Sequence, residues 1–231
     1  MNKILVSDYD ETFYTDEKSI EINKKAIKEF IDDKNIFIIA TGRSFLDFKN
    51  VYNKYNFYYD YVILNHGSTI LDNKDNIIFN SFIDNNIIDS LKKDLKIESS
   101  IRHFCCSQFE SRIDFDHKDL TKINIKYNSN VEALNIMNLI KDKYKEYINV
   151  FNISNSKLEI VSKESNKSKA ISLISNKLNI NINNIYTIGN GYSDIEMVKN
   201  FNGYCMKNSI QELKDIAIKE YNNVYELIED I

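Results

Sequence analysis

Two carboxylates stand one residue apart near the start of the chain, in the stretch "ILVSDYDETF". Asp8 and Asp10 follow an apolar run that ends at Val6, and Glu11 comes directly after them. Like charges this close repel each other, so they either face water or share a ligand. Carboxylate oxygens are the ligands that a hard divalent cation takes. The pair therefore indicates a candidate cation site at the end of the first predicted strand.

Other polar groups stand at equivalent places further along the chain. Thr41, Gly42 and Arg43 follow the apolar run "IFIIA", "GNGYSD" begins where "IYTI" ends, and Lys167 opens a helical pattern. A hydroxyl, a lysine and exposed backbone amides are groups that hold a phosphoryl group. Cation ligands together with phosphate-binding groups predict phosphoryl transfer.

Each of these stretches also has an ordinary structural interpretation. "DYD" alone fits a solvated turn, Thr41 with Gly42 fits a helix N-cap and a tight turn, and Lys167 fits a surface lysine. "GNGYSD" alone fits a turn. The ordered set favours a site, because every member falls at a strand end or a helix start, and ligands bind beyond the carboxyl ends of parallel strands.

The elements that must position these residues alternate along both ends of the chain. Apolar runs predict buried strands, and 3.6-residue periodicity predicts helices, the first with Ser19 as its N-cap. The strands are expected at 3–7, 35–41, 61–65, 185–190 and 203–206, and the helices at 19–34, 44–55, 167–178, 193–200 and 209–220. Strands that are apolar on both faces and alternate with helices predict a parallel sheet covered on both sides.

The middle of the chain has a different texture. After a hairpin at 68–82, the pattern predicts helices and antiparallel strands in mixed order. The helices are expected at 85–95 and 131–147, the strands at 101–109 and 120–128, and a closing hairpin at 148–161. We therefore expect an α/β core made of residues 1–81 and 164–231, with an inserted α+β domain at 82–163.

The bulk properties exclude several classes of protein. The chain has 231 residues, 43% of them hydrophobic, and a net charge of −4 without a basic block, so nucleic acid is not an expected partner. No apolar run approaches the ~20 residues of a membrane span, and the N-terminus does not resemble a signal peptide. The three cysteines have no metal-ligand spacing. We expect a cytoplasmic protein with reduced thiols, no membrane partner, and a monomeric or homodimeric state.

The four stretches together resemble a known family. "DYDET", "IIATGR", Lys167 at a helix start and "IGNGYSDIEM" are similar to the four motifs of the haloacid dehalogenase (HAD) superfamily. Their order and spacing resemble its Cof-like phosphatases, whose class IIB cap lies between the second and third motifs. The resemblance implies a HAD-like Rossmannoid core with an inserted α+β cap. "VILNHGSTILD" also resembles a hairpin of that group, but His66 separates the usual Asn-Gly pair.

The resemblance implies a role for each matching residue. Asp8 would be the nucleophile that forms a phosphoaspartate, and Asp10 the general acid and base. The phosphoryl oxygens would be held by Thr41, Lys167, Ser193 and the amides of Tyr9 and Gly42. Mg²⁺ would be held by the Asp8 side chain, the Asp10 carbonyl and Asn190, and Asp194 would be either a further ligand or an acid behind the ligands.

Three positions depart from the family pattern. Glu11 replaces the usual glycine, which should cost little unless the turn requires a positive φ. Ser193 replaces an asparagine and can still bond phosphate. Asn190 replaces an aspartate, so one negative charge is lost, and the affinity for Mg²⁺ should fall unless Asp194 compensates.

Two functions follow from these residues. The first is a Mg²⁺-dependent phosphatase for small phosphomonoesters such as sugar phosphates. The alternative is a catalytically weak HAD-fold protein that binds a phosphorylated metabolite; a phosphomutase fits less well, because its cap would follow the first motif. In the cap, Arg102, His103 and Arg112 could contact an anionic or sugar leaving group, or could be ordinary surface residues of a strand and its turn.

Overall fold

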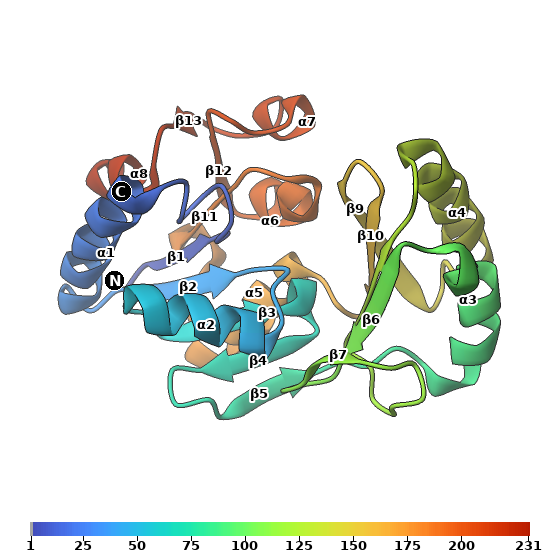
Figure 1. The fold of residues 1–231 in the computed structure, drawn as a ribbon. Helices are drawn as coiled ribbons and strands as arrows, with labels where there is room; N and C mark the ends of the chain where they lie inside the picture. Colours follow the sequence, from blue (N-terminus) through green and yellow to red (C-terminus); the bar gives the residue numbers. More distant parts are fainter. Residues whose placement is uncertain (1) are drawn as a thin grey trace.

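The computed structural model describes residues 2–231 and has two lobes, each built on its own β-sheet (Figure 1). The core lobe contains an eight-stranded sheet in the order β13-β12-β11-β1-β2-β3-β4-β5. Its strands pair in parallel from β13 to β3, and the β4–β5 hairpin adds two antiparallel strands at one edge. The cap lobe contains a five-stranded antiparallel sheet in the order β7-β6-β8-β10-β9. The predicted fold class is confirmed.

The core lobe takes its elements from both ends of the chain. Its strands are β1 (Ile4–Ser7), β2 (Ile36–Ala40), β3 (Tyr61–Leu64), β4 (Thr69–Asp72), β5 (Ile77–Asn80), β11 (Ile185–Gly189), β12 (Asn202–Met206) and β13 (Glu220–Tyr221). Its helices are α1 (Glu17–Asp32), α2 (Phe45–Tyr55), α5 (Lys167–Leu178), α6 (Ile195–Asn200), α7 (Gln211–Lys214) and α8 (Val224–Asp230).

The cap lobe is continuous in sequence. Its strands are β6 (Arg102–Cys106), β7 (Ser111–Ile113), β8 (Lys122–Lys126), β9 (Ile148–Ser154) and β10 (Lys157–Ser162), and its helices are α3 (Ile88–Asp94) and α4 (Asn130–Lys143). We propose that the domain boundaries lie at residues 82 and 164, on the two segments that join the lobes.

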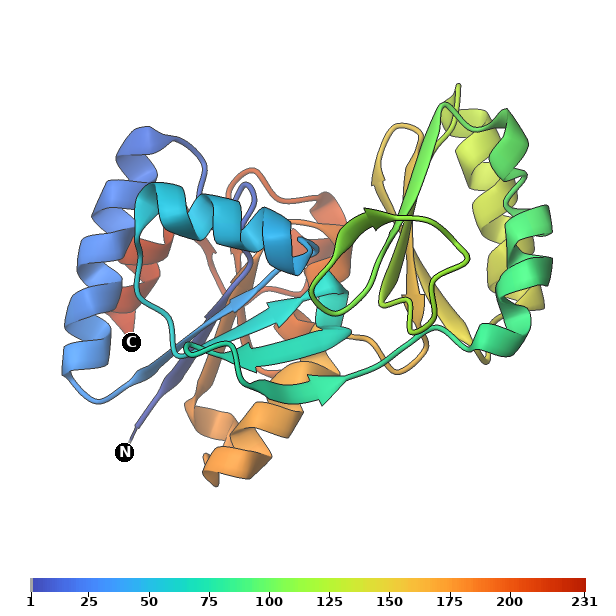
Figure 2. The same ribbon diagram turned by 60° about the horizontal axis from the view of Figure 1, so that its bottom comes forward.

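Both faces of the core sheet are buried, which explains its apolar strands. Leu5 and Ile39 pack with α1, α2 and α8 on one face, whereas Val6 and Ile38 pack with α5 and α6 on the other (Figure 2). Neighbouring residues of a strand point to opposite faces, so a strand that is covered on both sides must be apolar throughout. The layers bring the carboxyl ends of β1, β2 and β11 to the edge that faces the cap.

The cap sheet is covered on one face only. Ile123, Ile125, Leu158 and Ile160 form an apolar cluster with α3 and α4, which lie on the side away from the core (Figures 1 and 2). The other face turns toward the core lobe, and it carries polar residues at the alternate positions of the same strands. One sheet therefore supplies both the core of the cap lobe and a polar wall facing the candidate site.

The structure corrects some local predictions. The N-cap of α1 is Asp16, and Ser19 instead completes a capping box, in which the Asp16 carboxylate accepts from the Ser19 amide and the Ser19 hydroxyl accepts from the Asp16 amide. The helix expected at 209–220 is only the short α7, because the chain returns to the sheet as β13 and then forms α8. The short strand β7 was not predicted. No helix in residues 2–231 is long and apolar enough to cross a bilayer.

Candidate active site

Three buried charges meet at the carboxyl edge of the core sheet. Asp8 follows β1, Lys167 is the first residue of α5, and Asp194 lies in the turn after β11. The Lys167 ammonium donates to the Asp8 and Asp194 carboxylates, each at 2.6 Å. The side chains of Lys167 and Asp194 are each 1% exposed, and that of Asp8 is 10% exposed. The structure thus brings together three residues that sequence reasoning placed at separate strand and helix ends.

Burial and ion pairing shift the pKa values of Asp8 and Lys167 in opposite directions. Burial raises the pKa of Asp8 to about 7, with Asp194 acting in the same direction and Lys167 against it. Burial alone would lower the pKa of Lys167, but Asp194 and Asp8 together raise it above its ordinary value. Lys167 is therefore a fixed positive charge beneath the Asp8 carboxylate, in surroundings that exclude water.

Asp194 organises the loop around it. One carboxylate oxygen accepts from the amides of Asn190 and Gly191, both at 3.0 Å, while the other accepts from Lys167. A Cβ at Gly189 would lie 2.5 Å from the Asp194 carboxyl carbon, so this close approach requires glycine. Both oxygens are engaged by the protein itself, which favours the predicted role of an acid behind the ligands over the predicted role of a further cation ligand.

Asn190 lines the cavity in front of Asp8. Its side-chain oxygen accepts from the Thr12 hydroxyl at 3.3 Å, a contact that the sequence did not indicate. Within residues 2–231, no three or more His, Cys, Asp or Glu side chains are grouped as a metal site. Asp8 and Asn190 both line the cavity, and the oxygens of a carboxylate and an amide are donors that suit a hard cation such as Mg²⁺.

Asp10 is held by Arg43, a residue that the sequence placed at the same strand end as Thr41 and Gly42 but to which it assigned no role. Arg43 donates from Nε and a terminal nitrogen to the two Asp10 oxygens, at 2.9 and 2.7 Å. The guanidinium also lies over the Tyr9 ring, 5.1 Å from its centroid. This bidentate pair fixes where the Asp10 carboxylate stands at the wall of the cavity. The only signal in the sequence was the position of Arg43 directly after Thr41 and Gly42.

The predicted phosphate-binding residues are placed unequally. Gly42 and Ser193 line the cavity, whereas Tyr9 and Thr41 are fully buried. The Tyr9 ring packs against other aromatic rings and is closed to a ligand. The carbonyl of Thr41 accepts from the His66 amide at 3.1 Å. Because that carbonyl belongs to the Thr41–Gly42 peptide, the bond fixes the direction in which the Gly42 amide points.

Glu11, which replaces the usual glycine, lies in a turn with a positive φ. Its φ is 59°, the left-handed conformation that glycine adopts more readily than other residues. The Asn208 side chain donates to the Glu11 carbonyl at 3.1 Å and so contributes to holding the turn. The turn therefore has the positive φ that was the stated exception to the expectation of little cost.

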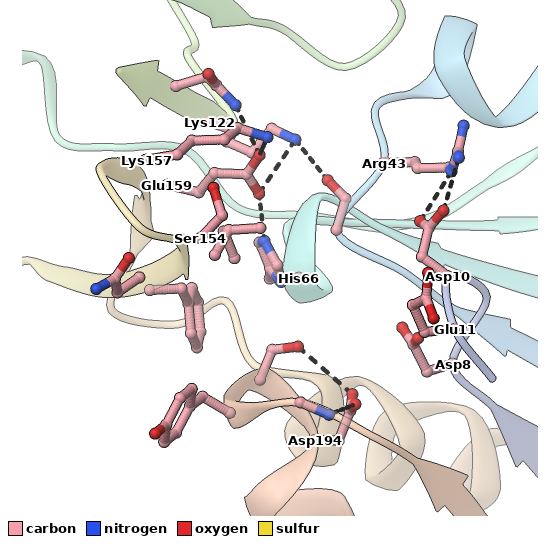
Figure 3. Close-up of a pocket in the computed structure, with 18 of the residues that line it drawn as sticks. Asp8, Asp10, Glu11, Arg43, His66, Lys122, Ser154, Lys157, Glu159 and Asp194 are labelled. Carbon is pink, nitrogen blue, oxygen red and sulfur yellow. Dashed lines mark hydrogen bonds and ion pairs between the residues drawn. The ribbon is translucent and has the colours of Figure 1, made fainter. Parts of the chain in front are cut away.

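A polar cluster from the cap forms the opposite wall of the cavity. The Glu159 carboxylate contacts Nε2 of His66 at 2.6 Å, the Asn124 amide at 2.7 Å and the Lys157 ammonium at 3.0 Å. Figure 3 shows Lys122, Lys157 and Glu159 on the side of the cavity away from Asp8 and Asp10. The Lys122 ammonium lies 3.6 Å from Glu159 and donates to the Gly42 carbonyl at 2.5 Å. The cap is thereby bonded to the candidate phosphate loop.

The cavity between these walls has a volume of about 940 Å³. Arg102 and Arg112 of the cap line it, together with Asp8, Asp10 and Asn190 of the core. His103 is separated from these two arginines, because its ring contacts Ser100 and Phe115 outside the cavity. A large polar cavity above a buried carboxylate and lysine is suited to a small anionic ligand.

Comparison with known proteins agrees with this geometry. A family model described as haloacid dehalogenase-like hydrolase matches residues 5–113 and 97–226. The chain belongs to this family. The resemblance of the four motifs to the HAD superfamily and its Cof-like members is confirmed.

Relatives of this HAD-family chain match it over nearly its full length. An uncharacterized protein of Mycoplasma capricolum is 30% identical, with 98% of this chain and 99% of the relative covered. The 5-amino-6-(5-phospho-D-ribitylamino)uracil phosphatase of Bacillus subtilis is 25% identical, with 93% and 88% covered. A crystal structure of a haloacid dehalogenase-like hydrolase from Bacteroides thetaiotaomicron aligns with a TM-score of 0.83 at 18% identity, covering 100% and 99%, and supports the fold.

The His66–Glu159 pair predicts acid sensitivity of this HAD-family chain. Burial would raise the pKa of Glu159, but Lys122 and the bond from His66 hold it far below its usual range. Burial lowers the pKa of His66, and its Nδ1 has no partner among the described residues, which fits a neutral ring with its proton on Nε2. Since both groups resist protonation in the fold, the unfolded chain binds more protons as the pH falls below about 6.5 for histidine and about 4.3 for glutamate.

The raised pKa of Asp8 stabilises the fold as the pH falls, whereas the lowered pKa of His66 destabilises it. We therefore expect the change in the free energy of unfolding between pH 7 and pH 5 to be less favourable in the wild type than in His66→Gln, since only the wild type has the histidine. Urea unfolding at several pH values measures this slope, and His117→Gln, which changes an exposed histidine of the cap, is the matched control. Equal slopes in His66→Gln and the wild type would contradict the assignment.

Proposed function

We propose that this chain is a Mg²⁺-dependent phosphatase that hydrolyses small phosphomonoesters, such as sugar phosphates, through a phosphoaspartyl intermediate on Asp8. The observation that carries the proposal is the buried contact of Lys167 with Asp8 and Asp194 at the base of the cavity. A carboxylate beside a fixed ammonium can receive a phosphoryl group whose charge the ammonium offsets. The Bacillus subtilis relative, whose name is that of a phosphatase for a phosphorylated sugar derivative, supports the same class of reaction.

The side chains divide the reaction into two displacements. Asp8 attacks the phosphorus in line, the bond from phosphorus to the leaving oxygen breaks, and Asp10 gives that oxygen a proton. Water then attacks the phosphorus of the phosphoaspartate, Asp10 takes a proton from it, and the bond to Asp8 breaks. Arg43 orients Asp10 for both transfers, while Lys167 and the Gly42 amide hold the phosphoryl oxygens.

The cation would be held by the Asp8 carboxylate, the Asp10 carbonyl and the Asn190 amide oxygen. When bound, Mg²⁺ supplies positive charge that offsets the repulsion between Asp8 and the phosphate. We place Asp194 behind these ligands, where it orients Lys167 and the loop that carries Asn190.

A panel of phosphomonoesters tests this function directly. The wild type should release inorganic phosphate from at least one member in the presence of Mg²⁺, and excess EDTA should stop the release. With a ³²P-labelled substrate, acid-quenched Asp10→Asn should retain label that hydroxylamine removes, as expected of an acyl phosphate. The absence of turnover with every member of the panel would make the proposal wrong.

The alternative, a catalytically weak protein that binds a phosphorylated metabolite, is favoured by one observation. Asn190 brings an uncharged oxygen to the cation site, so only the Asp8 side chain contributes a negative charge there. Asn190→Asp should lower the Mg²⁺ concentration for half-maximal activity by about tenfold, because ligand charge tunes the affinity of such sites.

The control is Asn155→Asp, which adds the same charge on the cap side of the cavity. A sharp rise in the maximal rate of Asn190→Asp, from an almost inactive wild type that ligands nevertheless stabilise, would select the alternative. An unchanged Mg²⁺ dependence would refute the argument from charge.

We also propose a cytoplasmic location, and a monomer or homodimer as the working form.

A further inference from the structure

One row of the cap sheet carries a cation on each of three neighbouring strands. Arg102 of β6 pairs with Lys126 of β8, which pairs with Lys157 of β10. Residues paired in this way share a face of the sheet, and like charges directly opposite each other destabilise it. The face is the one turned to the cavity, because Arg102 and Lys157 line it.

The positive charge of this row is not balanced within the protein. Lys157 contacts Glu159 at 3.0 Å, but the same carboxylate also contacts His66, Asn124 and Lys122. Among residues 2–231, no carboxylate forms an ion pair with Arg102 or Lys126. A costly row of cations that faces a ligand cavity indicates a place for an anion.

A β-bulge brings a further cation to the same place. Cys105 pairs with Ile113 and Cys106 with Ser111, so Arg112 is the extra residue of β7. Its φ of 64° is left-handed, a conformation that is unfavourable for a residue other than glycine. Bulges near sites redirect side chains, and this one brings the Arg112 guanidinium to 5.6 Å from the Phe104 ring centroid.

Phe104 is therefore flanked by two guanidinium groups. The Arg102 group lies 5.7 Å from the same ring centroid, and the half-buried ring lines the cavity. Within the described part of the chain, residues 2–231, the ion pair of Arg112 is with Asp47 of α2, at 4.0 Å, and the Arg112 side chain is 67% exposed. Both guanidiniums thus keep donors available for an anion, and the ring gives a ligand an apolar surface between them.

Resting on the phosphatase function proposed above, we infer that the substrate carries a second anionic group, remote from the reacting phosphoryl group. Arg102 and Arg112 hold this group beside Phe104, and Lys157 adds positive charge. A carboxylate or a second phosphate has the planar or tetrahedral oxygens that guanidinium binds with paired hydrogen bonds. The cavity of about 940 Å³ accommodates a leaving group that reaches from Asp8 to the cap.

Matched substrates that differ in one charge test this inference. 6-Phosphogluconate and sorbitol 6-phosphate share a six-carbon skeleton and differ in a terminal carboxylate, and fructose 1,6-bisphosphate against fructose 6-phosphate tests a second phosphate. We expect kcat/KM to favour at least one charged member by about tenfold or more, and the preference to shrink as the salt concentration rises. The pair that shows the preference distinguishes carboxylate from phosphate.

Variants then locate the preference. Arg102→Gln and Arg112→Gln should each bring the ratio of kcat/KM, taken between the compound with the second anionic group and its partner without it, closer to one. Lys93→Gln removes the same charge from an exposed position of α3, behind the cap sheet, and should leave the ratio unchanged. A ratio that survives both arginine substitutions, or that was never above one, overturns the subsite.

Binding to Asp8→Asn, measured as thermal stabilisation by the same four compounds, separates the subsite from the phosphatase function. Stronger stabilisation by the charged compounds without turnover in the wild type would support the subsite and overturn the function. Equal turnover of the compounds with and without the second anionic group, together with equal stabilisation, would overturn the subsite and leave the function standing.

Discussion

Asp8→Asn should abolish turnover while leaving the fold intact. The substitution keeps the shape of the side chain and the Lys167–Asp194 contact, but an amide oxygen does not form the acyl phosphate that the proposed route requires. We expect kcat to fall by at least about 10³-fold, the scale seen when a nucleophile is removed. Phosphate release from the best substrate of the panel measures the rate, and circular dichroism with thermal unfolding measures the fold.

The control for this prediction is Asp33→Asn, which makes the same change at an exposed residue after α1 and should retain full activity. Residual turnover in Asp8→Asn above a few per cent would show that another group attacks the phosphorus. A large loss of thermal stability would instead mean that the carboxylate has a structural role that the contacts do not indicate.

Lys167→Met should damage both stability and activity. Methionine has a similar volume, but the change leaves the Asp8 and Asp194 carboxylates buried without the cation that contacts each at 2.6 Å. Removing one partner from a buried ionic cluster costs about 3–5 kcal/mol. For a chain of this length, each kcal/mol lowers the Tm by roughly 2–4 °C. We therefore expect Tm to fall by roughly 6–20 °C, and activity to be lost at temperatures where the variant is folded.

Two variants make this second prediction sharper. Lys169→Met changes an exposed lysine two residues further along the same helix and should have little effect on Tm. Lys167→Met combined with Asp194→Asn removes one of the two uncompensated charges, so it should recover part of the stability and none of the activity. If Lys167→Met unfolds at the same temperature as Lys169→Met, the cluster is not the buried ionic unit that its geometry indicates.

The catalytic edge could be predicted from sequence because parallel strands deliver their carboxyl ends to one place. Asp8, Lys167 and Asp194 are far apart in the chain, yet each follows a strand or opens a helix whose pattern is unambiguous. Topology alone then brings them together. The sequence could not decide between the two predicted roles of Asp194, because the bonds that occupy its two oxygens depend on the exact path of the loop at Asn190 and Gly191.

The contacts between the lobes could not be predicted in this way. His66 and Glu159 pair across 93 positions of sequence, and neither residue has a motif or a spacing that marks the other. The pairing of Arg43 with Asp10 likewise depends on side-chain directions at two loops. The ends of α7 and the strand β13 were also missed, since the apolar residues of 209–220 fit a helix equally well when the tail of the segment is extended.

The bond from Lys122 to the Gly42 carbonyl links the closure of the two lobes to the conformation of the Gly42 loop. A motion that drew the lobes apart would break this bond and the contact of Glu159 with His66, and would leave Glu159 with its partners in the cap. Linkage between sites is reciprocal, so a ligand that stiffens the Gly42 loop must also hold the lobes shut. Under the proposed function, tighter binding of phosphate at the Gly42 loop would therefore go with slower release of the phosphate product.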